Sequence, residues 1–260
     1  MKSIDLFSGI GGMSLGLEMA GIEPVAHAEI NSYASKVLHK HWPDVPNLGD
    51  VTAIDWVNSG IDLTSVDLIA GGSPCQDVSV GNKHYSNIST GAKSSLWFEF
   101  KRAIEEVEPK YVIFENVKGI TKRGLDTVLQ DLASLGYDAI WQVIPASAVG
   151  ARHIRWRLFV LAYPNSERLQ EQWRATPACT EYTTAQRGRA VSKVLGQSIA
   201  RGAKANANLW KAEPSVGRMV DGVSNRVDRL RGLGNMVVPQ VAKVLGDTIM
   251  VVDKLMFTQP

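Results

Sequence analysis

The stretch Asp5-Leu6-Phe7-Ser8-Gly9-Ile10-Gly11-Gly12 decides how this chain begins to fold. Apolar, strand-type residues lead into it, and a helix-type amphipathic period follows over residues 12–20. A glycine-rich turn between a strand and a helix lies at the carboxyl edge of a parallel sheet, where α/β proteins bind nucleotides. The dinucleotide fingerprint would need glycine at Ser14, and the Lys-Ser/Thr pair of a P-loop is absent. The turn therefore favours a cofactor site, with a plain strand-to-helix turn as the alternative.

Strand-type and helix-type segments continue to alternate outward from this turn. This alternation predicts an α/β fold with a doubly wound, mostly parallel sheet. The further expected strands are residues 24–30, 66–71, 111–115, 139–144 and 157–162, and the expected helices are 33–41, 94–107, 125–135 and 237–255.

The character of the chain changes after Ala162, where sustained apolar periodicity is lost until Val237. We expect residues 1–163 and 224–260 to form one body and residues 164–223 to form a small irregular region. Residues 164–234 hold 12 Lys and Arg against 6 Asp and Glu, a net charge of +6, whereas the rest of the chain has −4. A basic segment on an acidic body indicates a polyanionic partner, with a solvated basic face as the alternative.

Overall composition excludes several classes of protein. The chain has 260 residues, 45% hydrophobic and 21% charged, which is typical of a folded domain. Two cysteines, Cys75 and Cys179, cannot form a disulfide framework, and neither has zinc-site spacing. The start of the sequence has no secretory pattern, and no apolar run is long enough to span a membrane. These features predict a protein of a reducing compartment, the cytoplasm.

One cysteine lies on a loop that directly follows an expected strand, in Gly71-Gly72-Ser73-Pro74-Cys75-Gln76-Asp77. A thiol beyond the edge of a sheet is well placed to act as a nucleophile. Residues 77–93, rich in Gly, Ser and Asn, have the composition of a lid. The alternative is an inert, buried cysteine.

Three acidic residues end strands or follow them at the same predicted edge. Glu115 follows four apolar residues, so it should be half buried, with a raised pKa that suits proton transfer. Glu29 lies about 20 residues after the glycines, the usual reach to a ribose. Asp50 could accept a hydrogen bond from an adenine amino group. Surface acids, or a helix-capping Glu-Asn pair at Glu115, are the alternatives.

Arg155 and Arg157 lie two residues apart at the start of the strand over residues 157–162, so both side chains should point to one face. Two guanidinium groups together favour an anion such as a phosphate. Surface salt bridges are the alternative.

In this order, DLFSGIGG, GGSPCQ, FENV, the Arg155-x-Arg157 pair and GLGNMVVPQ resemble the motifs of the DNA cytosine-5 methyltransferases of bacterial or phage type. The resemblance covers residues 1–163 and 226–260. It implies a Rossmann-like catalytic domain that depends on S-adenosylmethionine, formed by residues 1–163 and 224–260. It also implies that residues 164–223 are a small target-recognition region.

The resemblance assigns roles residue by residue. Cys75 would be the nucleophile, Glu115 the partner of the base, and Arg155 and Arg157 the residues that hold the extruded nucleotide. Gln76, Ser79 and Asn116 would contact the substrate. The S-adenosylmethionine site would comprise Phe7, Ser8, Gly9, Ile10, Gly11, Gly12, Glu29, Ile30, Asp50, Val51, Pro74, Leu96, Asn235 and Val237.

The implied activity is methyl transfer to carbon 5 of a flipped-out cytosine in duplex DNA through a covalent Cys75 adduct, with no metal. The resemblance further implies a cytoplasmic monomer in a bacterium or a phage host, and a cognate restriction endonuclease as a partner. The alternatives are a catalytically silent DNA-binding homologue and an RNA (tRNA) cytosine-5 methyltransferase. A nicotinamide-dependent dehydrogenase is disfavoured by Ser14 and Cys75.

Two features depart from the family's usual pattern. Arg152-His153 stands where the family usually shows Pro-Gln. The recognition region is also short, which predicts a short target or lax specificity.

Overall fold

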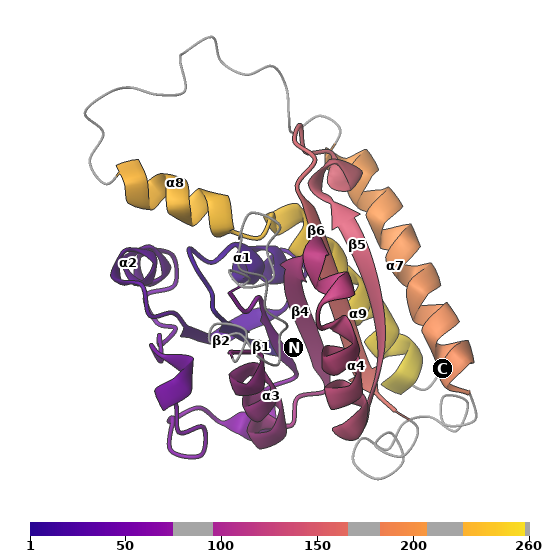
Figure 1. Cartoon of the computed structure of the whole chain (residues 1–260), viewed down its shortest axis with the longest axis horizontal. Helices are drawn as coiled ribbons and strands as arrows, with labels where there is room; N and C mark the ends of the chain where they lie inside the picture. The colour runs from indigo at the N-terminus through magenta and orange to yellow at the C-terminus, as the bar shows by residue number, and fades with distance from the viewer. Residues whose placement is uncertain (75–95, 166–182, 207–225, 258–260) are drawn as a thin grey trace.

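The structure, a computed structural model, describes residues 1–74, 96–165, 183–206 and 226–257. Cys75, Gln76, Ser79, Cys179 and the expected lid over residues 77–93 lie outside the described residues. A six-stranded sheet in the order β2-β1-β3-β4-β6-β5 forms the centre of the molecule (Figure 1). Its strands are β1 Lys2–Leu6, β2 Glu23–Ala28, β3 Leu68–Gly71, β4 Tyr111–Val117, β5 Tyr137–Pro145 and β6 Trp156–Pro164.

Five of the six strands point the same way, and only β6 runs against them. β1 pairs in parallel with β2 and β3, and β3 pairs in parallel with β4. β6 is antiparallel to both β4 and β5. The chain moves outward from β1 in both directions, so the order reverses between β1 and β3, where doubly wound proteins bind ligands. The predicted α/β, mostly parallel fold is confirmed.

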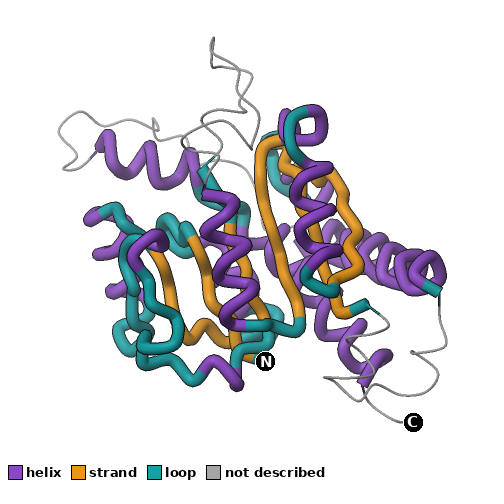
Figure 2. Tube along the Cα trace, turned by 60° about the horizontal axis from the view of Figure 1, so that its bottom comes forward, coloured by secondary structure: helices purple, strands orange, loops and turns teal. Residues whose placement is uncertain are grey.

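Helices cover both faces of the sheet (Figure 2). α3 and α4 pack on one face, and α1, α7 and α9 pack on the other. The described helices are α1 Gly12–Glu18, α2 Ser32–His41, α3 Leu96–Val107, α4 Leu125–Ser134, α7 Thr184–Asn206, α8 Arg226–Asn235 and α9 Pro239–Phe257.

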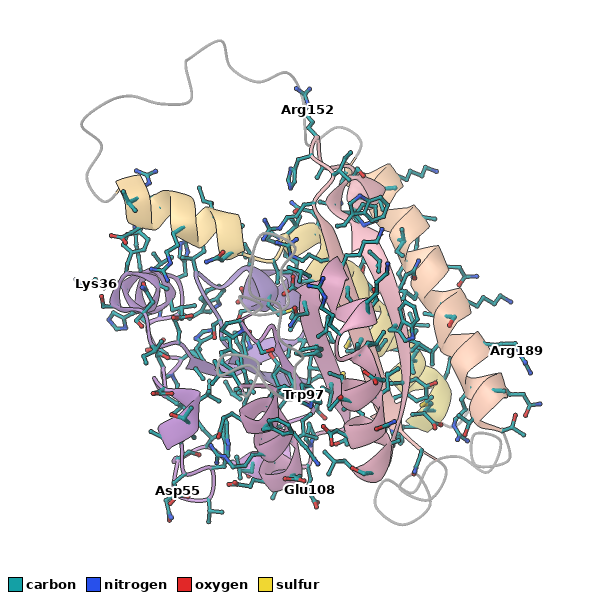
Figure 3. The ribbon with its side chains drawn as sticks, viewed as in Figure 1. Lys36, Asp55, Trp97, Glu108, Arg152 and Arg189 are labelled. Atoms are coloured by element: carbon teal, nitrogen blue, oxygen red, sulfur yellow. The ribbon has the colours of Figure 1, made fainter. Side chains whose placement is uncertain are left out.

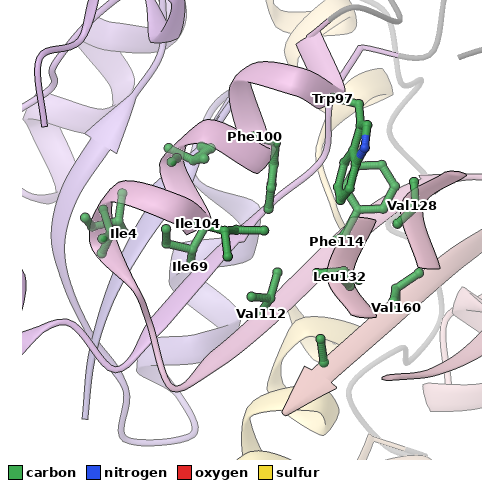
Figure 4. Close-up of a cluster of buried hydrophobic side chains, with 14 of the residues drawn as sticks. Ile4, Ile69, Trp97, Phe100, Ile104, Val112, Phe114, Val128, Leu132 and Val160 are labelled. Carbon is green, nitrogen blue, oxygen red and sulfur yellow. The ribbon is translucent and has the colours of Figure 1, made fainter. Parts of the chain in front are cut away.

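A cluster of three aromatic side chains fills the core between α3 and the sheet (Figure 4). The ring centroid of Trp97 lies 5.7 Å from that of Phe100 and 4.9 Å from that of Phe114 on β4. All three side chains are fully buried. Burial of these three aromatic side chains stabilises the packing of α3 on the sheet and fixes the position of β4 relative to α3.

The opposite core is closed by a contact between the first and the last helices. A Cβ atom added at Gly16 would overlap the Pro239 carbonyl and the Ala242 side chain, and one at Gly246 would crowd Ala20. These glycines let α1 and α9 approach closely. The stretch Val227–Phe257 is long and apolar enough to cross a membrane by length and composition alone, but its α9 part packs in this buried contact.

The expectation that residues 164–223 are irregular is wrong for residues 184–206. They form α7, whose Val191, Val194 and Leu195 are buried against the α9 side of the core. Arg187, also buried on α7, forms an ion pair with Asp138 of β5 at 2.8 Å. The segment is therefore a helix packed on the sheet domain, because its few apolar residues recur at helical spacing.

Candidate active site

A cavity of about 800 Å³ opens at the carboxyl edge of the sheet. Its wall comes from the segments that follow β1, β2, β3 and β4, from the start of β6 and from α8. It therefore lies at the point where the strand order reverses. A cavity of this size can enclose a nucleoside-sized ligand.

The glycine turn forms one end of the cavity and is held by hydrogen bonds. The amide of Gly9 donates to Glu29 Oε2 at 2.8 Å, and the amide of Asn31 donates to Oε1 at 2.7 Å. Phe7 has a φ of 55°, a left-handed conformation that is strained for a residue with a side chain. Gly11 has a φ of 84°, and a Cβ atom there would overlap the indole of Trp42. Glycine is thus required at position 11 for both backbone and packing reasons.

Beneath the turn lies a buried polar network that joins β1, α1 and β2. The hydroxyl of Ser14 donates to Asp5 Oδ2 at 2.6 Å and lies 3.1 Å from His27 Nε2. Burial raises the pKa of Asp5 to about 7, although hydrogen bonds from Ser14 oppose the shift. Burial also lowers the pKa of His27 to about 4. Both groups therefore resist ionisation in this environment.

At the other end of the cavity, the Glu115 carboxylate on β4 meets Arg157 on β6. Glu115 Oε1 lies 2.9 Å from Arg157 Nε. Burial raises the pKa of Glu115 to about 7, and the charges of Arg157 and Arg155 limit this rise. The pairing depends on the reversed direction of β6, which puts its first residues beside the last residues of β4, with Arg157 opposite Val117.

The end of β3 is fixed against this carboxylate by Gly72 and Asn116. A Cβ atom at Gly72 would overlap Glu115 Oε2, so glycine is needed for the close approach. The buried amide of Asn116 donates to the Ser73 carbonyl at 3.3 Å. Asn116 therefore holds the segment that leads to Pro74, whatever contact it makes with a substrate.

Comparison with known protein families shows which family the chain belongs to. The family of C-5 cytosine-specific DNA methylases matches residues 1–216. The chain belongs to this family. Among curated relatives, it is 36% identical over 167 residues to the type II methyltransferase M.HgiBI of Herpetosiphon aurantiacus. It is 37% identical over 168 residues to M.Eco47II of Escherichia coli. Each match covers 62% of this chain, but only 36% and 39% of the respective relative. The chain therefore spans well under half the length of these relatives.

Two solved structures resemble this C-5 methylase chain. One is named as a DNA modification methyltransferase encoded within an Escherichia coli prophage, with 28% identity and a TM-score of 0.53; the match covers 65% of this chain and 48% of that one. The other is the Dnmt2 methyltransferase of S. pombe, with 22% identity and a TM-score of 0.52 over 64% and 50%. The second likeness supports the fold alone.

Most of the residues that the sequence predicts for the cofactor line the cavity of this methylase. Two do not: Gly11 packs on Trp42, and Gly12 lies against Met236 and the Val237 carbonyl. Among the others, Asp50 also caps a short 3₁₀ turn by accepting a hydrogen bond from the Thr52 amide at 3.0 Å. The lining residues are Phe7, Ser8, Gly9, Ile10, Glu29, Ile30, Asp50, Val51, Pro74, Leu96, Asn235 and Val237.

Only some of the predicted catalytic and substrate-binding residues line the cavity. Glu115, Arg157 and Asn116 line the cavity. Arg155 does not, and its Nη2 instead donates to the Met236 carbonyl at 3.0 Å. Arg155 also has a φ of 27°, a second strained backbone position near the cavity. Cys75 follows Pro74 outside the described residues, so the structure gives its approach and not its position.

Sequence reasoning missed α8, which contributes part of the cavity wall. Asp228, Arg231 and Gly232 line the cavity from this helix, and Gly232 lies against Ile10 of the glycine turn. Its two internal glycines disfavour helix, which hid it in the sequence. The spacing of Asp228, Arg231 and Asn235 at one helical face was the signal that could have found it.

Proposed function

We propose that the chain transfers a methyl group from S-adenosylmethionine to carbon 5 of a cytosine flipped out of duplex DNA. The observation that carries this proposal is the Glu115–Arg157 pair in the same cavity as the glycine turn. A carboxyl group that can hold a proton lies next to a cofactor-type site, and the Ser73–Pro74 segment that precedes Cys75 is held beside it, as the reaction needs. Family membership supports the same chemistry.

The charge of the cavity suits the proposed cofactor. Burial favours the protonated forms of Asp5 and Glu115, but three further acids line the cavity, Glu29, Asp50 and Asp228. They stand against two arginines, of which Arg157 is paired with Glu115. In addition, Asp5 Oδ1 is buried in the described structure without a hydrogen-bond partner. A ligand with positive charge and hydroxyl donors fits this set, and S-adenosylmethionine has both. Glu29 would hold the ribose, and Asp50 the adenine. When bound, the cofactor supplies an electrophilic methyl group.

The residues of the chain would make carbon 5 of cytosine reactive. The Cys75 thiolate adds to carbon 6, while Glu115 hydrogen-bonds ring N3 and the exocyclic amine and stabilises the protonated ring. Electron density then reaches carbon 5, which would take the methyl group from the sulfonium, and S-adenosylhomocysteine would be the leaving group. Removal of the carbon 5 proton by a base and loss of the Cys75 thiolate restore the aromatic ring. A pKa near 7 lets Glu115 hold a proton at neutral pH for the first step.

The remaining assignments follow as parts of the same proposal. Arg157, already aligned by Glu115, would contact the extruded nucleotide, and Arg155 would brace the Met236 segment. Residues 164–223 would supply target recognition, but the α7 part belongs to the packed body. We propose double-stranded DNA as the partner, a monomeric enzyme, the cytoplasm as its location, and a cognate restriction endonuclease in the same system.

A covalent trap tests the proposed function. Genomic DNA copied with 5-fluorocytosine samples every target sequence, and fluorine at carbon 5 blocks the final elimination. With S-adenosylmethionine, the wild-type protein should form a denaturation-resistant adduct with this DNA, and Cys75→Ser should not. Cys75→Ser should still bind S-adenosylhomocysteine.

Three outcomes would reject the proposal. Cofactor binding with neither a covalent adduct nor transfer of a labelled methyl group to carbon 5 of ordinary DNA would indicate a silent homologue. Faster transfer to tRNA than to duplex DNA in direct competition would indicate an RNA enzyme. An adduct that survives in Cys75→Ser would remove Cys75 from the mechanism.

A further inference from the structure

A half-exposed tryptophan lies at the same edge of the sheet, just outside the cavity. Trp156 is the first residue of β6, and its side chain is 47% exposed. Alternation along the strand puts it on the face opposite to Arg155 and Arg157, which is the face that α3 and α4 cover. An indole exposed to this degree leaves a large apolar surface in water that a partner can cover.

A cation accompanies this indole. Lys118 directly follows β4, is exposed, and holds its Nζ 5.6 Å from the centroid of the Trp156 ring. Strands β4 and β6 are neighbours, and Arg157 lies opposite Val117. Lys118 and Trp156 are the next residues at this end of the two strands, so the pairing of the strands brings their side chains together. An ammonium near the face of an indole is attracted by the ring electrons and holds the ring in place.

Further exposed residues extend this surface beyond the sheet. Ile154 is 59% exposed, and Arg152 and His153 are also exposed. Figure 3 shows Arg152 pointing away from the body at the end of the β5–β6 arm. The surface therefore combines apolar area with positive charge, and Trp156 precedes Arg157 of the Glu115–Arg157 site by one residue.

We infer that Trp156 and Lys118 form a docking surface for duplex DNA beside the extruded cytosine. This inference rests on the proposed function. Lys118 pairs with a backbone phosphate, and the indole packs against the sugar and base next to the gap that the extruded cytosine leaves. Charge complementarity favours a polyanion here over an apolar protein partner. The cations of this surface are Lys118 and Arg152, which are both exposed, whereas Arg155 and Arg157 point to the other face and Arg157 pairs with Glu115.

Trp141 provides a matched control in the same molecule. It is 49% exposed on β5 and lies on the same face of the sheet as Trp156. In register it faces Val160, whereas Trp156 faces Pro145, so the two indoles are separated by four residues along the ladder. None of the described cations lies over the Trp141 ring. It therefore has the exposure of Trp156 without its charge or its position at the edge.

DNA binding by single variants tests the inference. The probe is a fluorescent mixed-sequence duplex of about 30 base pairs, titrated at several salt concentrations and followed by anisotropy. Trp156→Ala should weaken binding about 5- to 20-fold, and Trp156→Phe should restore most of it. Lys118→Met should weaken binding and reduce the slope of log K against log salt by about one. Trp141→Ala should bind as the wild type does. All variants should bind S-adenosylhomocysteine equally, which also shows that they are folded.

The outcomes separate this inference from the proposed function. If Trp156→Ala binds the duplex within twofold of the wild type, or if Trp141→Ala loses as much, the docking surface is wrong while the covalent trap stands. A change in oligomeric mass with unchanged DNA affinity would mean a protein partner and would also overturn it. If the wild type binds no duplex at all, the proposed function and the inference fail together.

Discussion

Asp5 and Glu115 both line one cavity and share a raised pKa, but their neighbours differ. Burial raises the pKa of each to about 7. The neighbours of Asp5 are the neutral Ser14 and His27, in a network that joins three elements. The neighbours of Glu115 are arginines, one of them at 2.9 Å. A raised pKa therefore does not by itself mark a catalytic group. Changes on the Asp5 side should affect the fold, and changes on the Glu115 side should affect the reaction.

The largest expected effect is on the Glu115 side. Glu115→Gln removes the proton that the cytosine ring would take, so single-turnover methyl transfer should slow by about 10³-fold or more. Calorimetric affinity for S-adenosylhomocysteine and the melting temperature should change little. Glu106→Gln, an acid on α3 that pairs with Arg102, serves as the control. A rate within tenfold of the wild type would contradict the distinction between the two acids.

A change in the glycine turn should mainly lower stability, whereas Glu115→Gln should mainly lower the rate of methyl transfer. Gly11→Ala introduces a Cβ atom that overlaps Trp42 at a positive φ, and should lower the free energy of unfolding by about 3–4 kcal/mol. At Gly9, with a φ of 56°, no atom lies within 4 Å of the same Cβ, so Gly9→Ala should lose only about 1 kcal/mol. Urea unfolding of both variants measures the difference. Equal losses would mean that Trp42 does not constrain the turn.

The pH dependence of stability sharpens the comparison further. His27 has a folded pKa of about 4, below its usual 6.5, so the unfolded chain takes up a proton that the folded chain excludes. Stability is therefore lost as the pH falls from about 6.5 to 4, by up to about 3 kcal/mol. His27→Gln lacks this loss. The raised pKa values of Asp5 and Glu115 act in the opposite direction in both proteins and largely cancel in the difference.

Urea unfolding of the wild type and His27→Gln at pH 7 and at pH 4.5 tests this sign. The stability advantage of the wild type should shrink at the lower pH. An advantage that stays constant or grows would show that His27 is charged in the folded protein.

The smallest of these effects is expected at Ser14. Ser14→Ala leaves Asp5 Oδ2 without its side-chain donor and His27 Nε2 without a partner, which should cost about 2 kcal/mol of stability. Methyl transfer by the folded fraction should stay within a few-fold of the wild type. Ser134→Ala, which loses only a local helix bond to the Asp131 carbonyl, should be near neutral. A large loss of rate in Ser14→Ala at full stability would assign the network to catalysis.

The sequence predicted this site well where function follows from the ends of strands. Glu29, Pro74 and Glu115 each follow or end a parallel strand, and parallel strands deliver their ends to one edge. Their placement needed only the apolar periodicity of the strands. The Arg157 pairing was harder, because it depends on the direction of β6 and on register with β4, which alternation within one strand does not reveal.

What escaped prediction depends on contacts between distant segments. Ser14 is separated from Asp5 and His27 in sequence, and only packing of α1 on β1 and β2 makes it their partner. Arg155 was expected to face the cavity, but it donates to the carbonyl of Met236, which no local pattern indicates. The helices α7 and α8 contain several glycines, which lower local helix propensity. Packing in the folded chain outweighs this propensity, so the sequence alone did not predict them.

The close contact between α1 and α9 bears on how the chain reaches its native state. Gly16 meets Ala242 across almost the whole described sequence, so the contact has very high sequence separation and can form only late. During synthesis, the apolar face of α1, with Met13 and Leu17, stays without its partner until the residues of α9 have left the ribosome. The glycine turn sits at the start of α1. Cofactor affinity should therefore appear in a single late step of folding rather than grow with chain length.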